Sequence, residues 1–383
     1  MHILSIGSDR NIFKKESAVR ERVISYGKIC DELHVIVFAK KGIVREKKVQ
    51  IAENVWAYPT NSFCKLFYVR DAVEIGRKIS RERNFPSGGS LITTQDPFES
   101  GLAGLRLKKK TGFPLNVQIH TDFLSKYFKK ESFLNRFRVF LAKKILPNAE
   151  TIRVVSEKIK KSLEEELQIK DEKIKILPIF TDILAFQNSP SFDFHGRYPE
   201  FSFVILMASR ITREKNFPLA FRALQIVLKK YPRTGLVVIG EGREKWKLQI
   251  IAFVKGLRKN IFFLPWQKNL APFYKSAKAF LLSSNYEGYG MTLVEAASSG
   301  TPIVTTDIGI ASEFFKNGES ALICSPRNAD CLAEKIIFLI EHSDKRILLK
   351  EYAFNEVCKR LPKNMEEYLL KYKEIWQLTI EHK

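Results

Sequence analysis

The stretch Asn285–Gly300, NYEGYGMTLVEAASSG, joins two carboxylates, a glycine-bearing loop and the start of a helix. The carboxylates, Glu287 and Glu295, stand eight positions apart, with two glycines between them. The apolar run Ala279–Leu282 precedes the stretch, so the pattern predicts strand, loop and helix in that order. Backbone N–H groups at such a helix start bind phosphate, whereas carboxylates bind hydroxyl groups. The combination predicts a site for a nucleotide sugar.

The composition indicates a folded protein of two domains with a large positive charge. The chain has 383 residues, and 45% of them are hydrophobic. This length exceeds that of a domain with one ordinary hydrophobic core, so two domains are expected. No apolar run approaches the roughly 18 to 20 residues that span a bilayer, and the first residues predict a buried strand rather than a signal peptide. The net charge of +22 favours an anionic partner such as nucleotide phosphates, a membrane face or nucleic acid.

The cysteines indicate a reducing compartment. There are five, an odd number, and no two form a C-x-x-C pair. This pattern argues against a disulfide framework and against a zinc site. We therefore expect a cytoplasmic protein.

Short apolar runs alternate with helical patterns along both halves of the chain, which predicts parallel sheets covered by helices. The series restarts after a linker near residues 183–200. We expect an N-terminal acceptor-side domain over 1–188 and a donor-binding domain over 189–363. A last helix over 364–383 would cross back onto the first domain. Two doubly wound domains of this kind would place a ligand cleft at the carboxyl ends of their strands.

The second half resembles glycosyltransferase family 4, the retaining enzymes of the GT-B fold. The resemblance covers residues 203–327. It is carried by five segments in order: MASRITREKNFPLAFRAL, VVIGEGREKWKL, FLPWQKNLAPFYKSAKAFLLSS, YEGYGMTLVEAASSGTPIVTT and GIASEFFKNGESALICSP. The family's E(x)7E pattern falls on Glu287 and Glu295, and its strand-end cations fall on Arg210 and Lys215. The resemblance implies an α/β protein with two Rossmann-like, doubly wound domains facing an interdomain cleft.

The resemblance also implies a role for each matching residue. Glu295 would hold the donor ribose, and Glu287 would contact the donor sugar. Arg210 and Lys215 would stabilise the departing diphosphate. Backbone N–H groups at the helix start would assist them, and these belong to Gly290, Met291 and Thr292. Positive charge placed there stabilises the leaving group more in the transition state than in the ground state. Family members generally need no metal, and the chain has no Asp-x-Asp motif, so we expect neither a metal nor a cofactor.

The first half resembles the family less. The usual glycine pair after the first strand is absent, and only Gly7 is present to allow a tight turn near the donor. His120 ends the strand in QIHTDF, where a family histidine contacts the donor sugar or the reaction centre. Asp96 and Glu99 follow another strand; they would either touch the acceptor or cap the next helix. Trp266 stands where the nucleobase is expected, or it fills the core, so the choice among UDP, GDP and ADP stays open.

Residues 123–146 combine positive charge with aromatic side chains. Seven residues of the segment are basic and one, Glu131, is acidic. The aromatic residues recur at roughly helical spacing, which is typical of a basic amphipathic helix on an anionic membrane. A helix packed in the first domain with a solvated basic face explains the pattern equally well. The membrane interpretation predicts a peripheral protein on the cytoplasmic leaflet.

The sequence therefore predicts a retaining glycosyltransferase. It would move a hexosyl-type group from a nucleoside diphosphate sugar to a hydroxyl of a glycan or lipid-linked acceptor. One alternative is a nucleotide-sugar epimerase or other GT-B relative, which needs no acceptor. A second alternative is a basic nucleic-acid-binding protein, whose binding would depend strongly on salt. No recognition-helix motif supports that second alternative, so no nucleic-acid partner is expected.

Overall fold

The computed structural model describes residues 1–382, which divide into two compact units. Unit 1 holds Met1–Pro178 together with residues 365–382, and unit 2 holds Ile179–Asn364. The first boundary thus follows Pro178 rather than residue 188, because the segment after β8 packs with unit 2. Lys383, the last residue of the predicted terminal helix, lies outside the described residues.

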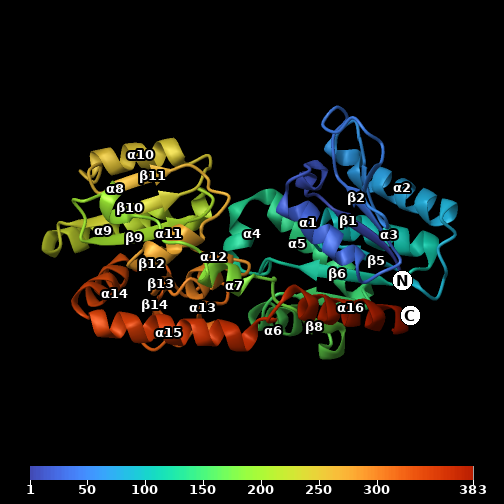
Figure 1. The fold of residues 1–383 in the computed structure, drawn as a ribbon. Helices are drawn as coiled ribbons and strands as arrows, with labels where there is room; N and C mark the ends of the chain where they lie inside the picture. The colour runs from blue at the N-terminus through green and yellow to red at the C-terminus, as the bar shows by residue number, and fades with distance from the viewer. Residues whose placement is uncertain (383) are drawn as a thin grey trace. The chain divides into compact units, whose positions relative to one another are not determined.

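Unit 1 is built on an eight-stranded sheet with the order β3-β4-β2-β1-β5-β6-β7-β8 (Figure 1). All neighbouring strands are parallel except β3 and β4. The strands are β1 His2–Gly7, β2 Glu32–Val37, β3 Val49–Ala52, β4 Val55–Pro59, β5 Ser90–Thr94, β6 Leu115–Ile119, β7 Thr151–Val154 and β8 Ile174–Ile176. The helices are α1 Ala18–Gly27, α2 Tyr68–Glu82, α3 Glu99–Thr111, α4 Lys126–Glu131, α5 Phe133–Ile145, α6 Glu157–Leu167 and α16 Met365–Glu381.

Helix α16 belongs to unit 1 although it ends the chain. It packs on β5, β6 and β7 and buries an aromatic face that includes Tyr368, Tyr372 and Trp376. Arg153 of β7 is buried beneath it and donates hydrogen bonds to the Tyr368 hydroxyl and to the Leu177 and Pro178 carbonyls. A buried guanidinium must be hydrogen-bonded, so these contacts join the end of β8 to the last helix.

Unit 2 is built on a six-stranded parallel sheet with the order β11-β10-β9-β12-β13-β14. The strands are β9 Phe203–Ala208, β10 Thr234–Ile239, β11 Ile261–Leu264, β12 Ala279–Leu282, β13 Ile303–Thr306 and β14 Leu322–Cys324. The helices are α7 Ile183–Gln187, α8 Phe194–Arg197, α9 Phe217–Lys230, α10 Lys245–Val254, α11 Ala271–Ser276, α12 Met291–Ser298, α13 Ala311–Phe314, α14 Ala329–Glu341 and α15 Ser343–Arg360.

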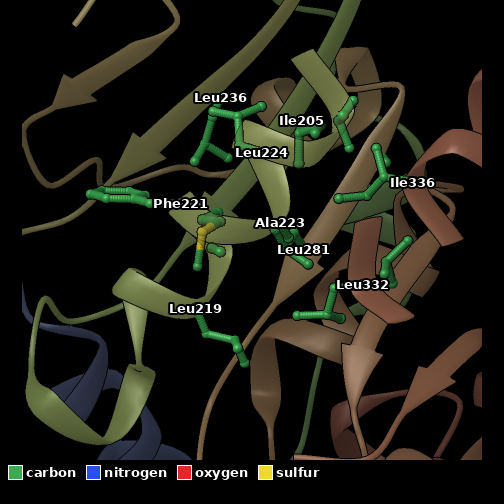
Figure 2. Close-up of a cluster of buried hydrophobic side chains, with 14 of the residues drawn as sticks. Ile205, Leu219, Phe221, Ala223, Leu224, Leu236, Leu281, Leu332 and Ile336 are labelled. Carbon is green, nitrogen blue, oxygen red and sulfur yellow. The ribbon is translucent and has the colours of Figure 1, made fainter. Parts of the chain in front are cut away.

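The core of unit 2 explains why these segments form strands and helices. Strands β9 and β12 are runs of buried apolar residues, as expected for a parallel sheet covered on both faces. Helices α9 and α14 pack on one another over the sheet. Figure 2 shows side chains from β9, β10, β12, α9 and α14 meeting there, among them Ile205, Leu224 and Leu332.

The basic aromatic segment 123–146 is not one helix. It forms α4 and α5, which are interrupted at Ser132. The Ser132 hydroxyl accepts a hydrogen bond from the Asn135 N–H, which begins a new helix in place of continuing the old one. The expectation of one continuous helix was therefore wrong. Neither helix is long and apolar enough to cross a membrane, and this holds for every helix among residues 1–382.

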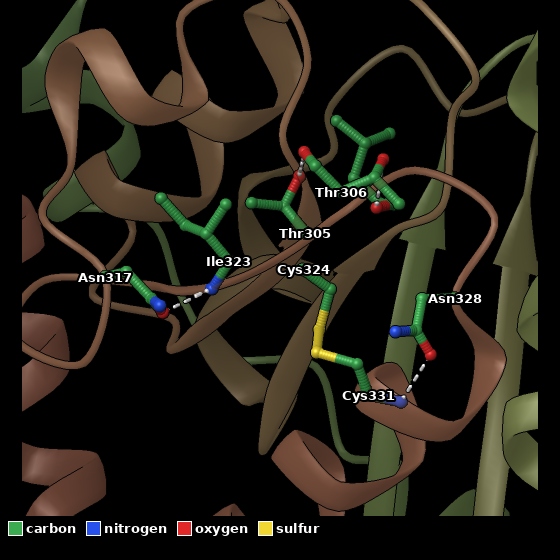
Figure 3. Close-up of a disulfide and its surroundings, with 8 residues drawn as sticks. Thr305, Thr306, Asn317, Ile323, Cys324, Asn328 and Cys331 are labelled. Carbon is green, nitrogen blue, oxygen red and sulfur yellow. Dashed lines mark hydrogen bonds between the residues drawn. A yellow bond between two sulfur atoms is a disulfide. The ribbon is translucent and has the colours of Figure 1, made fainter.

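The expectation that the cysteines form no disulfide was also wrong. Cys324, at the end of β14, is bonded to Cys331 in the first turn of α14 (Figure 3). The two residues are seven positions apart, and the loop between them folds back so that the strand end meets the helix. Cys30, Cys64 and Cys358 are free thiols.

Candidate functional site

Strand order places the candidate site of unit 2. Strand β9 is the first of its sheet; β10 and β11 extend it on one side, and β12, β13 and β14 on the other. The loops after β9 and β12 therefore diverge at a topological switch point, where doubly wound sheets bind ligands. Arg210 and Lys215 follow β9, and Glu287 follows β12. The sheet thus gathers residues that are more than seventy positions apart in sequence.

Two strand-end loops hold Lys215 in place. Lys215 ends the short 3-10 helix η5, Arg213–Lys215, and its carbonyl oxygen accepts a hydrogen bond of 3.0 Å from the Ser283 hydroxyl. The next residue, Asn216, adopts the left-handed conformation and donates to the Asn285 side chain at 3.0 Å. Asparagine tolerates this conformation better than most residues. The main chain at Lys215 is therefore fixed to the loop after β12.

The Lys215 side chain forms an ion pair with Glu287. Nζ lies 2.5 Å from Oε1, and the two side chains are 11% and 12% exposed. The same carboxylate oxygen accepts a hydrogen bond of 2.8 Å from the Ser284 hydroxyl. A charge-assisted pair in such a position is strong as long as both partners remain. Each charge therefore positions the other at the end of β12.

Arg210 lies in the same loop as Lys215 but is exposed. Among residues 1–382 its guanidinium has no ion-pair partner, so it is available to an anion. Close packing underneath supports the loop: a Cβ at Gly240 would lie 2.0 Å from the Ser209 carbonyl oxygen, and one at Gly242 would lie 2.1 Å from the Ile211 carbonyl oxygen. The two glycines therefore serve backbone packing between the loops after β9 and β10.

The start of α12 has no side-chain cap among the described residues 1–382. Gly290 precedes the helix at φ +97°. The N–H groups of Met291 and Thr292 in the first turn therefore remain available to a phosphate. Gly309 supports this loop from behind, since a Cβ there would lie 2.3 Å from the Tyr289 carbonyl oxygen.

Glu295 is largely enclosed, one turn further along α12. Its Oε2 accepts a hydrogen bond of 2.9 Å from the Tyr274 hydroxyl of α11. Burial raises the pKa of the Glu295 carboxyl, and the hydrogen bond from Tyr274 works in the opposite direction. This carboxyl can accept hydrogen bonds from hydroxyl groups in a weakly solvated position.

Unit 1 holds the two remaining predicted site residues, each at the carboxyl end of a strand. Gly7 ends β1, and a Cβ there would lie 2.1 Å from the Gln95 side-chain oxygen, so a larger residue would displace the Gln95 side chain. His120 follows β6 and is half-buried. Burial, followed by the positive charges of Arg153 and Arg22, lowers the pKa of His120 to about 3. The imidazole is therefore neutral near pH 7.

Asp96 and Glu99 serve the structure of unit 1. The Asp96 carboxylate accepts hydrogen bonds from the Phe98 N–H at 2.8 Å and from the Ser100 hydroxyl. Glu99 forms an ion pair of 3.1 Å with Arg138 of α5. These contacts fix the loop before α3 and tie the start of that helix to α5, although no side chain caps the N-terminus of α3 among the described residues. Trp266, after β11, is exposed and so does not fill the core.

Sequence reasoning missed three supporting residues: Tyr274, Ser284 and Gly309. Ser284 lies in the loop between β12 and Glu287, so its position relative to the carboxylates was a usable signal. Tyr274 and Gly309 come from other elements, and no spacing in the sequence relates them to Glu295 or Tyr289. Only the folded sheet brings them together.

Two family models match most of the chain. "Glycosyltransferase Family 4" matches residues 30–183, and "Glycosyl transferases group 1" matches residues 190–356. An uncharacterised glycosyltransferase of Methanocaldococcus jannaschii is 29% identical over 202 residues, 52% of this chain and 48% of that protein. The alpha-monoglucosyldiacylglycerol synthase of Acholeplasma laidlawii is 23% identical over 70% of each chain. The match therefore spans about half the length of the first relative.

Solved structures share the fold. Sucrose-phosphate synthase from Thermosynechococcus elongatus superimposes with a TM-score of 0.80 at 19% identity over 98% of both chains. HepE of Anabaena in complex with UDP-glucose superimposes with a TM-score of 0.75 at 18% identity, again over 98% of both chains. At these identities the likeness shows the fold alone.

Proposed function

Because this chain belongs to the family 4 glycosyltransferases of GT-B fold, we propose that it is a retaining hexosyltransferase. It moves a sugar from a nucleoside diphosphate donor to a hydroxyl of a glycan or glycolipid acceptor. The observation that carries the proposal is the Lys215–Glu287 pair beside the uncapped start of α12. Cations, free N–H groups and a carboxylate meet there, as a nucleotide sugar requires.

Each part of the donor has a partner in this arrangement. Arg210, Lys215 and the first N–H groups of α12 bind the diphosphate. Glu295 accepts hydrogen bonds from the ribose hydroxyls, and Glu287 contacts the sugar. In unit 1, the roles that the resemblance implies for His120 and Gly7 toward the donor stay predictions.

The proposed reaction retains the configuration of the anomeric carbon. The bond between that carbon and the diphosphate oxygen breaks, and the acceptor oxygen bonds to the same face. The acceptor proton passes to an oxygen of the departing diphosphate. Negative charge grows on the diphosphate as the bond breaks, so fixed cations there lower the barrier. No step needs a metal or a cofactor.

The relatives suggest which donors and acceptors to try first. A Streptococcus agalactiae relative is named for UDP-N-acetylglucosamine, and the HepE structure contains UDP-glucose. The Acholeplasma relative is named for a glucosylated diacylglycerol. We therefore propose UDP-sugars as the donors and a lipid-linked or glycan acceptor. Incubation with UDP-glucose and a diacylglycerol acceptor should release UDP and give an α-linked product by NMR.

Incubation with the donor sugar and no acceptor is the control that distinguishes a transferase from an epimerase. An epimerase would convert the donor sugar without an acceptor and without net release of nucleotide. Epimerised sugar in the absence of transfer would contradict the proposal. Unchanged rates in the presence of EDTA are expected, whereas loss of activity that Mg²⁺ restores would contradict metal independence.

A peripheral membrane location is the second part of the proposal. Helix α5 exposes Phe133, Phe137 and Phe140, and cations lie over two of their rings: Arg136 over Phe133 and Lys144 over Phe140. Basic and aromatic side chains together favour an anionic bilayer face, here the cytoplasmic leaflet. The protein should sediment with phosphatidylglycerol vesicles at low salt. Failure to sediment would contradict the membrane location and leave the reaction untouched.

A further inference from the structure

Helix α10 of unit 2 exposes an apolar face that the donor site does not use. Leu248 and Ala252 point into the core, where they are 3% and 4% exposed. Opposite them, at 100° per residue, four large apolar side chains form a continuous stripe. These are Trp246, Ile250, Phe253 and Val254, which are 59%, 52%, 64% and 76% exposed. Solvated helices normally carry polar residues on this face.

The surroundings of this stripe are positively charged. Residues 241–259 contain six basic and two acidic residues. Both acidic residues already have partners within unit 2: Glu241 pairs with Lys245 at 2.8 Å, and Glu244 with Arg213 at 3.5 Å. Arg243, which precedes the helix, and Arg258 and Lys259, which follow it, are exposed. The face is thus apolar at its centre and basic at its rim.

We propose that this face, Trp246–Val254 with its basic rim, docks on an anionic lipid surface. Aromatic side chains favour the level of the lipid head groups, and basic side chains favour anionic lipids. The helix would lie parallel to the bilayer plane with Trp246 and Phe253 among the upper acyl chains. This second contact belongs to unit 2 and depends neither on α5 nor on the proposed reaction.

A second copy of the chain fits the face less well. Symmetric association brings the same patch of each copy together, so the basic rims would oppose one another. Like charges at short range disfavour such a contact, whereas an anionic bilayer neutralises them. The charge of the rim therefore selects lipid as the occupant.

The four tryptophans permit a direct test. Trp56 and Trp376 are buried, and only Trp246 and Trp266 are exposed. In the full-length Trp266→Phe variant, Trp246 is the exposed reporter. Phosphatidylglycerol vesicles that contain phosphatidylcholine brominated on its acyl chains should quench this fluorescence and shift it to the blue. Vesicles of brominated phosphatidylcholine alone should have little effect.

Sedimentation with vesicles measures how much binding is lost when the apolar face is changed. Trp246→Ser with Phe253→Ser should weaken binding to phosphatidylglycerol vesicles at least about tenfold, since two apolar side chains no longer leave water. Ile347→Ser, an exposed apolar position on α15 of the same unit, should leave binding unchanged. Thermal unfolding of all variants should match that of the parent, because every changed side chain is exposed.

Three outcomes would overturn the proposal. The first is sedimentation of the protein without quenching of Trp246, which would place the contact elsewhere, such as on α5. The second is equal binding by the double variant and the parent. The third is a dimer by light scattering that the double variant converts to a monomer, which would assign the face to a second copy.

Discussion

The ammonium group of Lys215 lies 2.5 Å from a carboxylate oxygen of Glu287, across the two strand-end loops at the switch point of the unit 2 sheet. Neither side chain is more than 12% exposed. The pair fixes a cation and a carboxylate beside one another at the ends of β9 and β12. A donor that binds there meets charges already in position, which lowers the cost of reorganisation in the transition state.

Removal of the cation should affect both catalysis and stability. Lys215→Ala should lower the rate of donor turnover by about 100-fold or more, as removal of one preorganised stabilising group does. It should also lower the midpoint of thermal unfolding, because the Glu287 carboxylate loses its partner. Lys316→Ala is the control, since Lys316 and its partner Glu319 are exposed. A Lys215→Ala enzyme with near-normal turnover would contradict the role of this residue.

The carboxyl of Glu295 should act through nucleotide affinity. Tyr274→Phe removes the hydroxyl that donates to it, which should cost about 0.5–1.5 kcal/mol of stability. Glu295→Gln should weaken binding of the nucleoside diphosphate by calorimetry, because the amide accepts ribose hydrogen bonds less well than the carboxylate. Equal affinity of Glu295→Gln and the parent would exclude ribose recognition by this residue.

Two glycines offer a matched test of the loop before α12. Gly309→Ala places a Cβ against the Tyr289 carbonyl oxygen, so the loop that carries Glu287 must move. Gly300→Ala introduces the same residue at φ +68° but meets nothing within 4 Å. Both substitutions place an alanine in the left-handed conformation, which costs about 1–2 kcal/mol. Calorimetry should show weaker nucleotide binding for Gly309→Ala only. An equal loss of affinity in both variants would mean that backbone strain alone causes the effect.

Much of unit 2 was predictable from the sequence because its signals are local. The apolar runs gave the strands, and Arg210, Lys215 and Glu287 were recognised at strand ends. The contact between Lys215 and Glu287 was not predictable, since it depends on β9 and β12 being neighbours. The same holds for Tyr274 beneath Glu295 and for the Cys324–Cys331 bond. The break at Ser132 did have a local signal, a serine at an N-cap position, which the strong charge pattern of the segment obscured.

The pKa of His120 predicts how acid affects the protein. A histidine whose folded pKa is lowered to about 3 binds its proton more readily in the unfolded state. Its contribution to stability is therefore present above its ordinary pKa near 6.5 and is lost as pH falls toward 3. His120→Asn should flatten the stability profile between these values, as measured by urea unfolding. An unchanged profile would show that His120 protonates freely in the folded protein.

Reduction of the disulfide should lower the stability of the protein. It closes a loop of eight residues from Cys324 to Cys331, which in the chain-entropy treatment contributes about 2.5 kcal/mol. Dithiothreitol should lower the unfolding midpoint of the parent but leave that of Cys331→Ser unchanged. The same midpoint for the parent with and without reductant would contradict a stabilising bond.

The central claim, that unit 2 binds a nucleoside diphosphate sugar at Arg210, Lys215 and the start of α12, is tested most directly by thermal shift. UDP, GDP, ADP and their sugars would be compared in the parent protein and in Arg210→Ala, a change at an exposed residue. A ligand at 100 times its dissociation constant stabilises the parent by about 2.7 kcal/mol. We expect one nucleotide class to raise the parent's midpoint and to lose most of that effect in Arg210→Ala. No shift with any of these ligands, or an equal shift in both proteins, would contradict the account.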